Sequence, residues 1–362
     1  MARTGATETR AMPVTNLTLV VPELLRETSV RLPALERLLA RSDPLPCAVA
    51  EGGVVPLLFQ IFGIASDPLP IAAVTRAFDS QDPTPGWWLR ADPVHLQINQ
   101  STVRLFDQRV LRLAANEAER LAAEVSATDH PPPSSQQDFR LEALHPTRWY
   151  LPLATPAHIQ TSRLATVHGQ DIRHYLPEGK DGKAWQRWLN HCQILLHNSP
   201  VNAEREARGE APINSVWLWG EGETPNVIKG TFSHVWSDEP LALGLALLAK
   251  TPYDAQPENA EDWLYQTSRR STGKDLVVLQ DLLDLSEAAP SINPAEDWQS
   301  ALNRLEQTWF APLLAALQTE TLASLTLYPC PAPPRTITGT QLRRRWWRRG
   351  RALGGYVVKV AL

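Results

Sequence analysis

The spacing of hydrophobic residues near the start of the chain changes from the period of a strand to the period of a helix. Residues 16–21 (NLTLVV) alternate and then run apolar, which predicts a strand that Pro22 ends. Residues 32–43 place four leucines on one helical face and their charged residues on the other. A strand followed by an amphipathic helix predicts the opening of an α/β unit.

The same alternation returns in the last third of the chain. Residues 240–250 (PLALGLALLAK) predict a helix, and residues 275–283 (DLVVLQDLL) contain the apolar core of a buried parallel strand. Residues 295–317 form the clearest amphipathic pattern in the chain, and residues 322–329 predict a further strand. Both ends of the chain therefore predict strands that alternate with helices.

The middle of the chain has a different pattern. Residues 88–99 and 139–153 alternate like strands, and residues 116–125 predict a short helix. A helix of about 20 residues is expected from Lys183 onward, and Pro200 must interrupt it. Residues 68–90, rich in proline and tryptophan, are predicted to be a connector with little regular structure.

The simplest architecture for this order is an α/β sheet flanked by helices and interrupted by an inserted α+β domain. The predicted organisation is a disordered start (1–12), an α/β core (13–90 and 212–342), an inserted domain (91–211) and a basic tail (343–362).

Composition places the protein in the globular class. Its 362 residues include three widely spaced cysteines without a CxxC pair, which predicts neither a disulfide framework nor a zinc cluster. No run of eighteen apolar residues occurs, and the first residues lack the apolar core of a secretion signal. We expect a cytoplasmic protein that has no membrane partner.

The net charge of −4 conceals a segregation of charge along the chain. From Arg343 to the end there are six arginines, one lysine and no acidic residue, whereas the preceding residues carry 28 basic and 39 acidic side chains. Arginines beside Trp346 and Trp347 fit single-stranded nucleic acid or an anionic membrane surface. The favoured interpretation is that the tail lies across the acidic body with its tryptophans buried, and nucleic-acid binding stays an alternative.

The segment 213–225 (INSVWLWGEGETP) carries the most specific local signal. An apolar run ending in Trp219 is followed by Gly220 and Gly222, and a glycine turn after a strand lets backbone amides approach an anion. The alternative is that the tryptophans pack a core and the glycines make a tight turn.

The residues from 197 to 225 resemble a pattern of the archaeal-type, cofactor-independent phosphoglycerate mutases, N-x-x-R…G-x-x-P-x-N-x-[IV]-W-[LF]-W-G-x-G-x-x-P. This resemblance implies an alkaline-phosphatase-like fold. Ten positions match: Asn202, Arg205, Gly209, Pro212, Asn214, Trp217, Trp219, Gly220, Gly222 and Pro225.

Three further segments make the chain similar to a bacterial family of regulation-of-pathogenicity-factors type E regulatory proteins. They are WLRADPVHLQ (88–97), LEQTWFAPLLAAL (305–317) and RRRWWRR (343–349). This second resemblance implies a regulatory protein.

The mutase resemblance implies two divalent metals, held by aspartates and histidines, and a serine nucleophile. The chain has Pro22-Glu23 where that family has Asp-Gly, and Leu279-Gln280 where a histidine is expected. All nine histidines lie at or before His234. We therefore expect a catalytically degenerate regulatory or metabolite-sensing protein without a metal or other cofactor. An active mutase or phosphotransfer enzyme is the alternative.

A rebuilt metal site would have to use the remaining imidazoles and nearby acids. No pair of them has the HxxxH or HxH spacing that places two imidazoles on one metal, so each is interpreted as a core or surface residue. The candidates are His95, His168, His174, His197 and His234.

The residues that surround an anion in the mutases can remain in a protein that has lost the metal ligands. Asn202, Arg205 and Asn214 could bind a small phosphorylated metabolite beside Trp219 and the two glycines. The structural alternative is that Asn202 caps a helix, Arg205 pairs with Glu204 or Glu206, and Asn214 ties a loop to a strand.

A second candidate site is the segment ADPVHL (91–96), in which Asp92 and His95 either line a pocket or fix a turn. A protein partner is also expected for a regulator.

Overall fold

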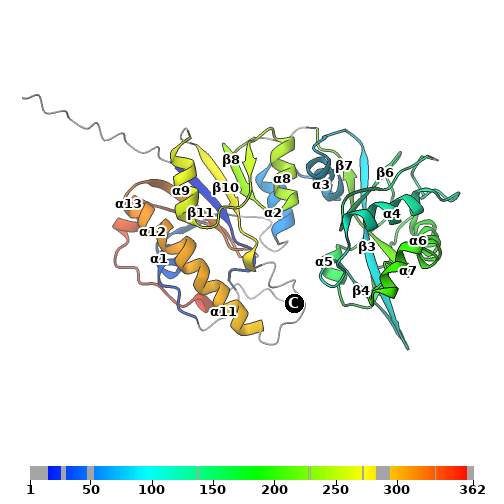
Figure 1. The fold of residues 1–362 in the computed structure, drawn as a ribbon. Helices are drawn as coiled ribbons and strands as arrows, with labels where there is room; N and C mark the ends of the chain where they lie inside the picture. The colour runs from blue at the N-terminus through cyan, green and yellow to red at the C-terminus, as the bar shows by residue number, and fades with distance from the viewer. Residues whose placement is uncertain are drawn as a thin grey trace, which may run out of the picture.

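A computed structural model describes residues 15–25, 30–46, 53–136, 138–226, 228, 230–270, 273–282, 294–330 and 332–356. The predicted disordered start lies outside these residues. The described chain forms two units, each with its own sheet and hydrophobic core (Figure 1). None of the described helices is long and apolar enough to cross a lipid bilayer.

The larger sheet has seven strands in the order β2-β12-β11-β1-β10-β8-β9. Its five strands from β11 to β9 are parallel, and β12 is antiparallel to both of its neighbours. The bounds are β1 (Thr15–Val20), β2 (Asp43–Pro44), β8 (His234–Ser237), β9 (Tyr253–Asp254), β10 (Lys274–Val278), β11 (Leu322–Tyr328) and β12 (Arg335–Thr338).

Helices cover both faces of this sheet, because its central strand β1 has apolar side chains on both faces. In β1, Leu17 and Leu19 face one apolar cluster and Val20 faces another. The first cluster is formed with α1 (Pro33–Arg41), α9 (Ala260–Ser268), α11 (Pro294–Leu305), the π-helical turn η3 (Glu306–Phe310), α12 (Ala311–Gln318) and α13 (Gly339–Arg344). The second is formed with α2 (Val54–Ile61), α3 (Ile71–Ser80) and α8 (Pro240–Leu248). The predicted α/β sheet flanked by helices is confirmed.

The second unit is an antiparallel sheet covered by helices. Its long strand β3 pairs with β7 on one side and with β6 and then β4 on the other. The strands are β3 (Trp87–Asn99), β4 (Thr102–Phe106), β5 (Glu142–His145), β6 (Arg148–Leu153) and β7 (Ser215–Glu223). The helices are α4 (Ala115–Ser126), α5 (Leu164–Val167), η2 (Ile172–His174), α6 (Gly182–His197) and α7 (Pro200–Ala207).

The strands β3 and β7 extend on both sides of the range 91–211 that the sequence predicted for the insertion. The tryptophan segment is therefore an antiparallel strand of the inserted unit. It does not lead into a turn at the carboxyl end of a core strand, because β7 continues through Gly220 and Gly222 to Glu223. The predicted glycine turn is wrong.

The predicted connector 68–90 contains a regular helix, α3. The helix packs against α8 of the core unit and against β7 and β3 of the inserted unit (Figure 1). Its residues 71 to 77 are all buried, including Thr75 and Arg76. The apolar residues of α3 follow the helical period, but the surrounding prolines and tryptophans led to the prediction of a connector.

Glycines allow α3 to approach so closely on both sides. A Cβ atom added to Gly222 would lie 2.5 Å from the Cα of Pro70, the N-cap residue of α3. A Cβ added to Gly244 of α8 would lie 2.2 Å from the carbonyl oxygen of Val74. Such distances are far inside van der Waals contact, so these positions exclude any side chain.

We expect Gly222→Ala to destabilise the protein by about 2 kcal/mol or more, because the added methyl group must push α3 away from β7. Urea unfolding measures the loss. Gly354→Ala is the matched control, since a Cβ there meets no atom within 4 Å and should change stability by less than about 0.5 kcal/mol. Equal stability of the two variants would contradict the close contact.

Candidate functional site

The carboxyl edge of the larger sheet is the first place to look for chemistry, because ligands of open α/β sheets bind there. An amide and carboxylate network fills the ends of β8, β9 and β10 at this edge. Gln280 Nε2 donates to Glu239 Oε2 at 2.5 Å, and the Gln280 backbone N–H donates to Gln256 Oε1 at 3.2 Å. Gln256 in turn donates its side chain to Asp281 and its backbone N–H to Asp238.

This donor set does not fit two divalent cations. Eight of the nine histidines lie in the inserted unit, and the ninth, His234, begins β8 at the opposite edge of the sheet. Within the described residues, no group of three or more histidine, cysteine, aspartate or glutamate side chains is arranged to hold a metal ion. The amide of Gln280 also occupies a carboxylate oxygen that a cation would need.

Asp92 and Trp219, two of the predicted ligand residues, do lie together. Asp92 is 1% exposed, and Arg90 donates to both of its carboxylate oxygens at 2.8 and 2.7 Å. Trp219 Nε1 donates to Asp92 Oδ2 at 2.7 Å, and the backbone N–H of Trp149 donates to Oδ1 at 3.1 Å. Burial raises the pKa of Asp92, while the Arg90 charge and these hydrogen bonds act in the opposite direction.

The cluster continues toward α3. The Arg90 guanidinium lies 4.9 Å from the ring centre of Trp219 and 5.2 Å from that of Tyr150. Tyr150 donates its hydroxyl to Asp79 of α3 at 2.5 Å, and Arg148 donates two bonds to the same carboxylate at 2.7 Å. These buried polar groups therefore join the inserted sheet to α3.

Asn202 and Asn214 direct their amides at the backbone of their own chain. Asn202 donates to the carbonyls of Leu196 and Ile213 and accepts the Ile213 N–H at 2.8 Å. Asn214 accepts the Leu96 N–H at 2.7 Å and donates to the Leu96 carbonyl at 2.9 Å, as a residue in a strand would. The expected helix cap at Asn202 is wrong, because Ser199 is the N-cap of α7. The expected tie of Asn214 to a strand is confirmed.

Arg205 is 1% exposed and is held by groups that the sequence did not identify. It pairs with Glu117 of α4 at 2.8 Å and with Glu210 at 3.3 Å, instead of with Glu204 or Glu206. Its Nε donates to the Ala211 carbonyl at 3.0 Å. The error arose because only the tertiary packing of α7 on α4 brings Glu117 close.

The remaining predicted residues are dispersed. His95 Nδ1 lies 2.9 Å from the carbonyl oxygen of Pro212. Gly220 and Gly222 lie beneath the start of α3, where a Cβ on Gly220 would be 3.1 Å from Ile71. His168 and His234 each face a single aspartate, in different units. These contacts favour the structural alternative, and anion binding by Asn202, Arg205 and Asn214 stays a prediction.

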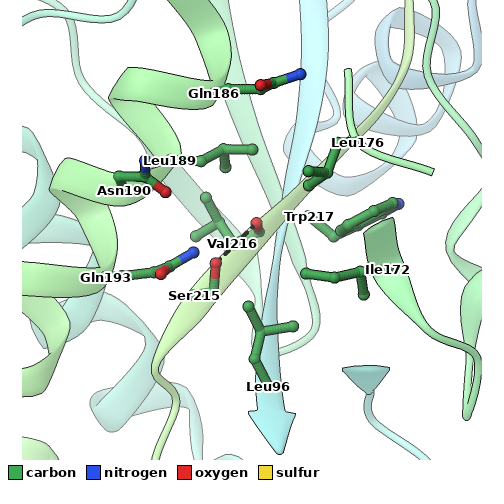
Figure 2. Close-up of a pocket in the computed structure, with 10 residues that line it drawn as sticks. All are labelled: Leu96, Ile172, Leu176, Gln186, Leu189, Asn190, Gln193, Ser215, Val216 and Trp217. Atoms are coloured by element: carbon green, nitrogen blue, oxygen red, sulfur yellow. Dashed lines mark hydrogen bonds between the residues drawn. The ribbon is translucent and has the colours of Figure 1, made fainter. Parts of the chain in front are cut away.

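A small cavity of about 120 Å³ lies between α6 and β7 (Figure 2). Gln186, Asn190 and Gln193 approach it from successive turns of α6, and Trp217 and Leu96 lie opposite them. No charged side chain lines it. The complete lining is Leu96, Ile172, Leu176, Gln186, Leu189, Asn190, Gln193, Ser215, Val216 and Trp217. Spacing on α6 could have indicated this amide stripe, which the sequence interpretation missed.

Local stretches of the chain match curated 2,3-bisphosphoglycerate-independent phosphoglycerate mutases. The relative from Methanosarcina mazei is 39% identical over 59 residues, 16% of this chain and 15% of that protein. The relative from Methanothrix thermoacetophila is 31% identical over 102 residues, 27% of this chain and 24% of that protein. The chain thus matches less than a quarter of the length of either relative. These matches indicate a phosphoglycerate-mutase-like family.

One solved structure shows a likeness at the level of the fold. The PH0037 protein from Pyrococcus horikoshii superposes with a TM-score of 0.55 at 13% identity, over 94% of this chain and 92% of that one. The cofactor-independent phosphoglycerate mutase from Thermoplasma acidophilum gives a TM-score of 0.49 at 14% identity, over 96% of both chains. No family model matches the chain. The predicted kinship with the type E regulatory proteins is not supported by these comparisons.

We expect Arg205→Met to lower the free energy of unfolding by about 3 kcal/mol or more, because it leaves Glu117 buried beside a reduced positive charge. Arg120→Met is the matched control: its ion pair with Glu204 is exposed and should contribute less than about 1 kcal/mol. Denaturant unfolding of both variants distinguishes a structural role of Arg205 from a role in ligand binding alone. If Arg205 served only a ligand, its substitution would leave the free energy of unfolding unchanged.

Glu221 of β7 is a second unusual carboxyl group, in addition to Asp92 of β3. It is 7% exposed, and its Oε2 atom has no hydrogen-bond partner in the described part of the chain. Burial raises the pKa of Glu221 from its ordinary value near 4.5 to about 7. The folded state therefore binds this proton more tightly than the unfolded chain does.

Because the folded state prefers the protonated Glu221 carboxyl, this group favours folding fully below about pH 4.5. The gain in the free energy of unfolding is lost as the pH rises through 7. Glu221→Gln should remove this dependence and make the protein more stable than the wild type at pH 8, by about 2 kcal/mol. Urea unfolding from pH 5 to 8.5 measures it, with the exposed Glu223→Gln as the control. Parallel pH profiles for wild type and Glu221→Gln would contradict the raised pKa.

Proposed function

We propose that this phosphoglycerate-mutase-like protein is a non-catalytic regulatory or metabolite-sensing protein. The observation that carries the proposal is the carboxyl edge of its larger sheet. There, Gln280 donates to Glu239, and every histidine lies elsewhere in the molecule.

The physical argument concerns charge. An in-line phosphoryl transfer needs two cations that neutralise the attacking and leaving oxygens as charge develops on them. A glutamine amide supplies neither a negative charge to hold a cation nor a cation's stabilisation of the phosphoryl oxygens. Asp238, Glu239 and Asp281 do carry negative charge at this edge, but no histidine joins them and, among the described residues, they are not arranged to hold a metal ion.

The cavity of the inserted unit, at about 120 Å³, is smaller than ordinary small-molecule pockets, so a sensing role there is limited to a very small ligand. The cavity's amides and its apolar floor favour an uncharged ligand with one polar edge, since no side chain in the lining would neutralise a phosphate. A phosphorylated metabolite, predicted from the motif residues, would instead have to compete with the contacts that Arg205 already makes to Glu117 and Glu210.

The alternative is an active mutase. It is favoured by the local identity to enzymes with that name, such as the relative from Methanosarcina mazei. Under this alternative, Glu239 and its neighbours would release their amide partners to bind metal when substrate arrives.

Phosphorus NMR of the full chain with 3-phosphoglycerate, after metal removal and reloading with manganese, tests the two functions. We expect no conversion to 2-phosphoglycerate and no stoichiometric manganese in elemental analysis of the protein. The Methanosarcina mazei enzyme, assayed identically, is the positive control. Manganese-dependent conversion that Glu239→Gln abolishes would overturn the non-catalytic function.

A further inference from the structure

The basic segment that follows α13 is fixed to the body of the protein by its backbone. Arg41 of α1 donates to the carbonyls of Leu342 and Trp346 at 3.0 and 2.9 Å. Leu353 is buried in the core of the larger unit, and a Cβ on Gly350 would lie 2.9 Å from Glu36. The predicted docking of the tail on its own body is therefore confirmed for the described residues up to 356.

The predicted burial of the tryptophans is wrong. Trp346 is 73% exposed and Trp347 is 61% exposed, with their rings edge to face at 6.4 Å. The segment docks through main-chain carbonyls, Leu353 and the ion pairs of Arg343 and Arg345, so the anchoring contacts use neither indole. Two adjacent large aromatic rings held in solvent are rare without a binding role.

Most of the arginines of this segment are also free to contact a ligand. Arg343 pairs with Glu320 and Arg345 with Asp43, but four other arginines are exposed and have no ion pair within the described residues. We call the six residues that project from the segment the Arg/Trp surface: Arg344, Trp346, Trp347, Arg348, Arg349 and Arg351.

We propose that the Arg/Trp surface binds single-stranded nucleic acid. Arginines contact backbone phosphates, and indole faces stack on unpaired bases irrespective of sequence. The geometry is suited to this, because the backbone of the segment is already ordered by Arg41 and little conformational freedom is lost on binding.

Two observations favour this ligand over an anionic membrane. Between residues 343 and 356, the part of the segment that the structure describes, no large exposed aliphatic side chain accompanies the two indoles, whereas an interfacial helix needs a continuous apolar face. The remainder of the chain is acidic, which confines phosphates to the Arg/Trp surface and limits the site to a short strand. This function is independent of the chemistry at the sheet edge.

Fluorescence anisotropy of a labelled twelve-nucleotide oligouridylate, titrated with the full chain at several salt concentrations, tests the proposal. We expect the logarithm of the affinity to fall with the logarithm of salt with a slope of about −3, for four phosphate contacts. Trp346→Ala combined with Trp347→Ala should weaken binding at least about 10-fold without changing that slope.

Charge variants distinguish binding at the Arg/Trp surface from a general electrostatic attraction between the protein and the oligonucleotide. Arg348→Gln with Arg349→Gln should halve the slope, whereas Arg104→Gln with Arg140→Gln, an equal charge change at exposed positions of the inserted unit, should leave binding unchanged. The proposal is overturned if no binding occurs up to about 100 µM protein at low salt, or if the double alanine variant binds like the wild type. Tighter binding to phosphatidylserine vesicles, or self-association that the same variants abolish, would also overturn it.

Discussion

The close approach of α3 to two neighbours is the constraint on which the arrangement of the molecule depends. Each neighbour has a glycine at the point of closest approach, Gly222 in β7 and Gly244 in α8. Helix and sheet backbones can then pack at a separation that larger residues forbid. One ten-residue helix thereby joins α8 of the core unit to β3 and β7 of the inserted unit.

A buried polar cluster stabilises the same junction, and each of its members depends on the presence of the others. Asp92 is desolvated, so it is tolerated only because Arg90, Trp219 and a backbone amide all donate to it. Arg90 in turn lies against the faces of Trp219 and Tyr150. Removing one member would leave the others unpaired in a region of low dielectric constant, which explains why aromatic rings and opposite charges occur together here.

The sequence predicted those elements whose two faces differ. The helices α1, α11 and α12 have one apolar face, and their leucine spacing identified them. The helix α3 is an exception, because it has the helical spacing of apolar residues but lies among the prolines and tryptophans of residues 68–90, from which a connector was predicted. The strand β7 was located correctly, but a strand's own residues do not determine which sheet it joins. The exposure of Trp346 and Trp347 was missed because the anchoring contacts come from carbonyl groups, to which the sequence gives no clue.

For the candidate site, the sequence shows that all nine histidines lie at or before His234. The structure adds that His234 stands at the start of β8, the end of the strand opposite to the carboxyl edge. The matched motif proved to be structural in its contacts: Asn202, Asn214 and Gly222 tie or space backbone segments, and Arg205 neutralises Glu117. Residues with such roles persist as long as the fold persists, whatever happens to the chemistry. A likeness carried by these positions is therefore a likeness of architecture, and the function has to be argued from the sheet edge and the Arg/Trp surface.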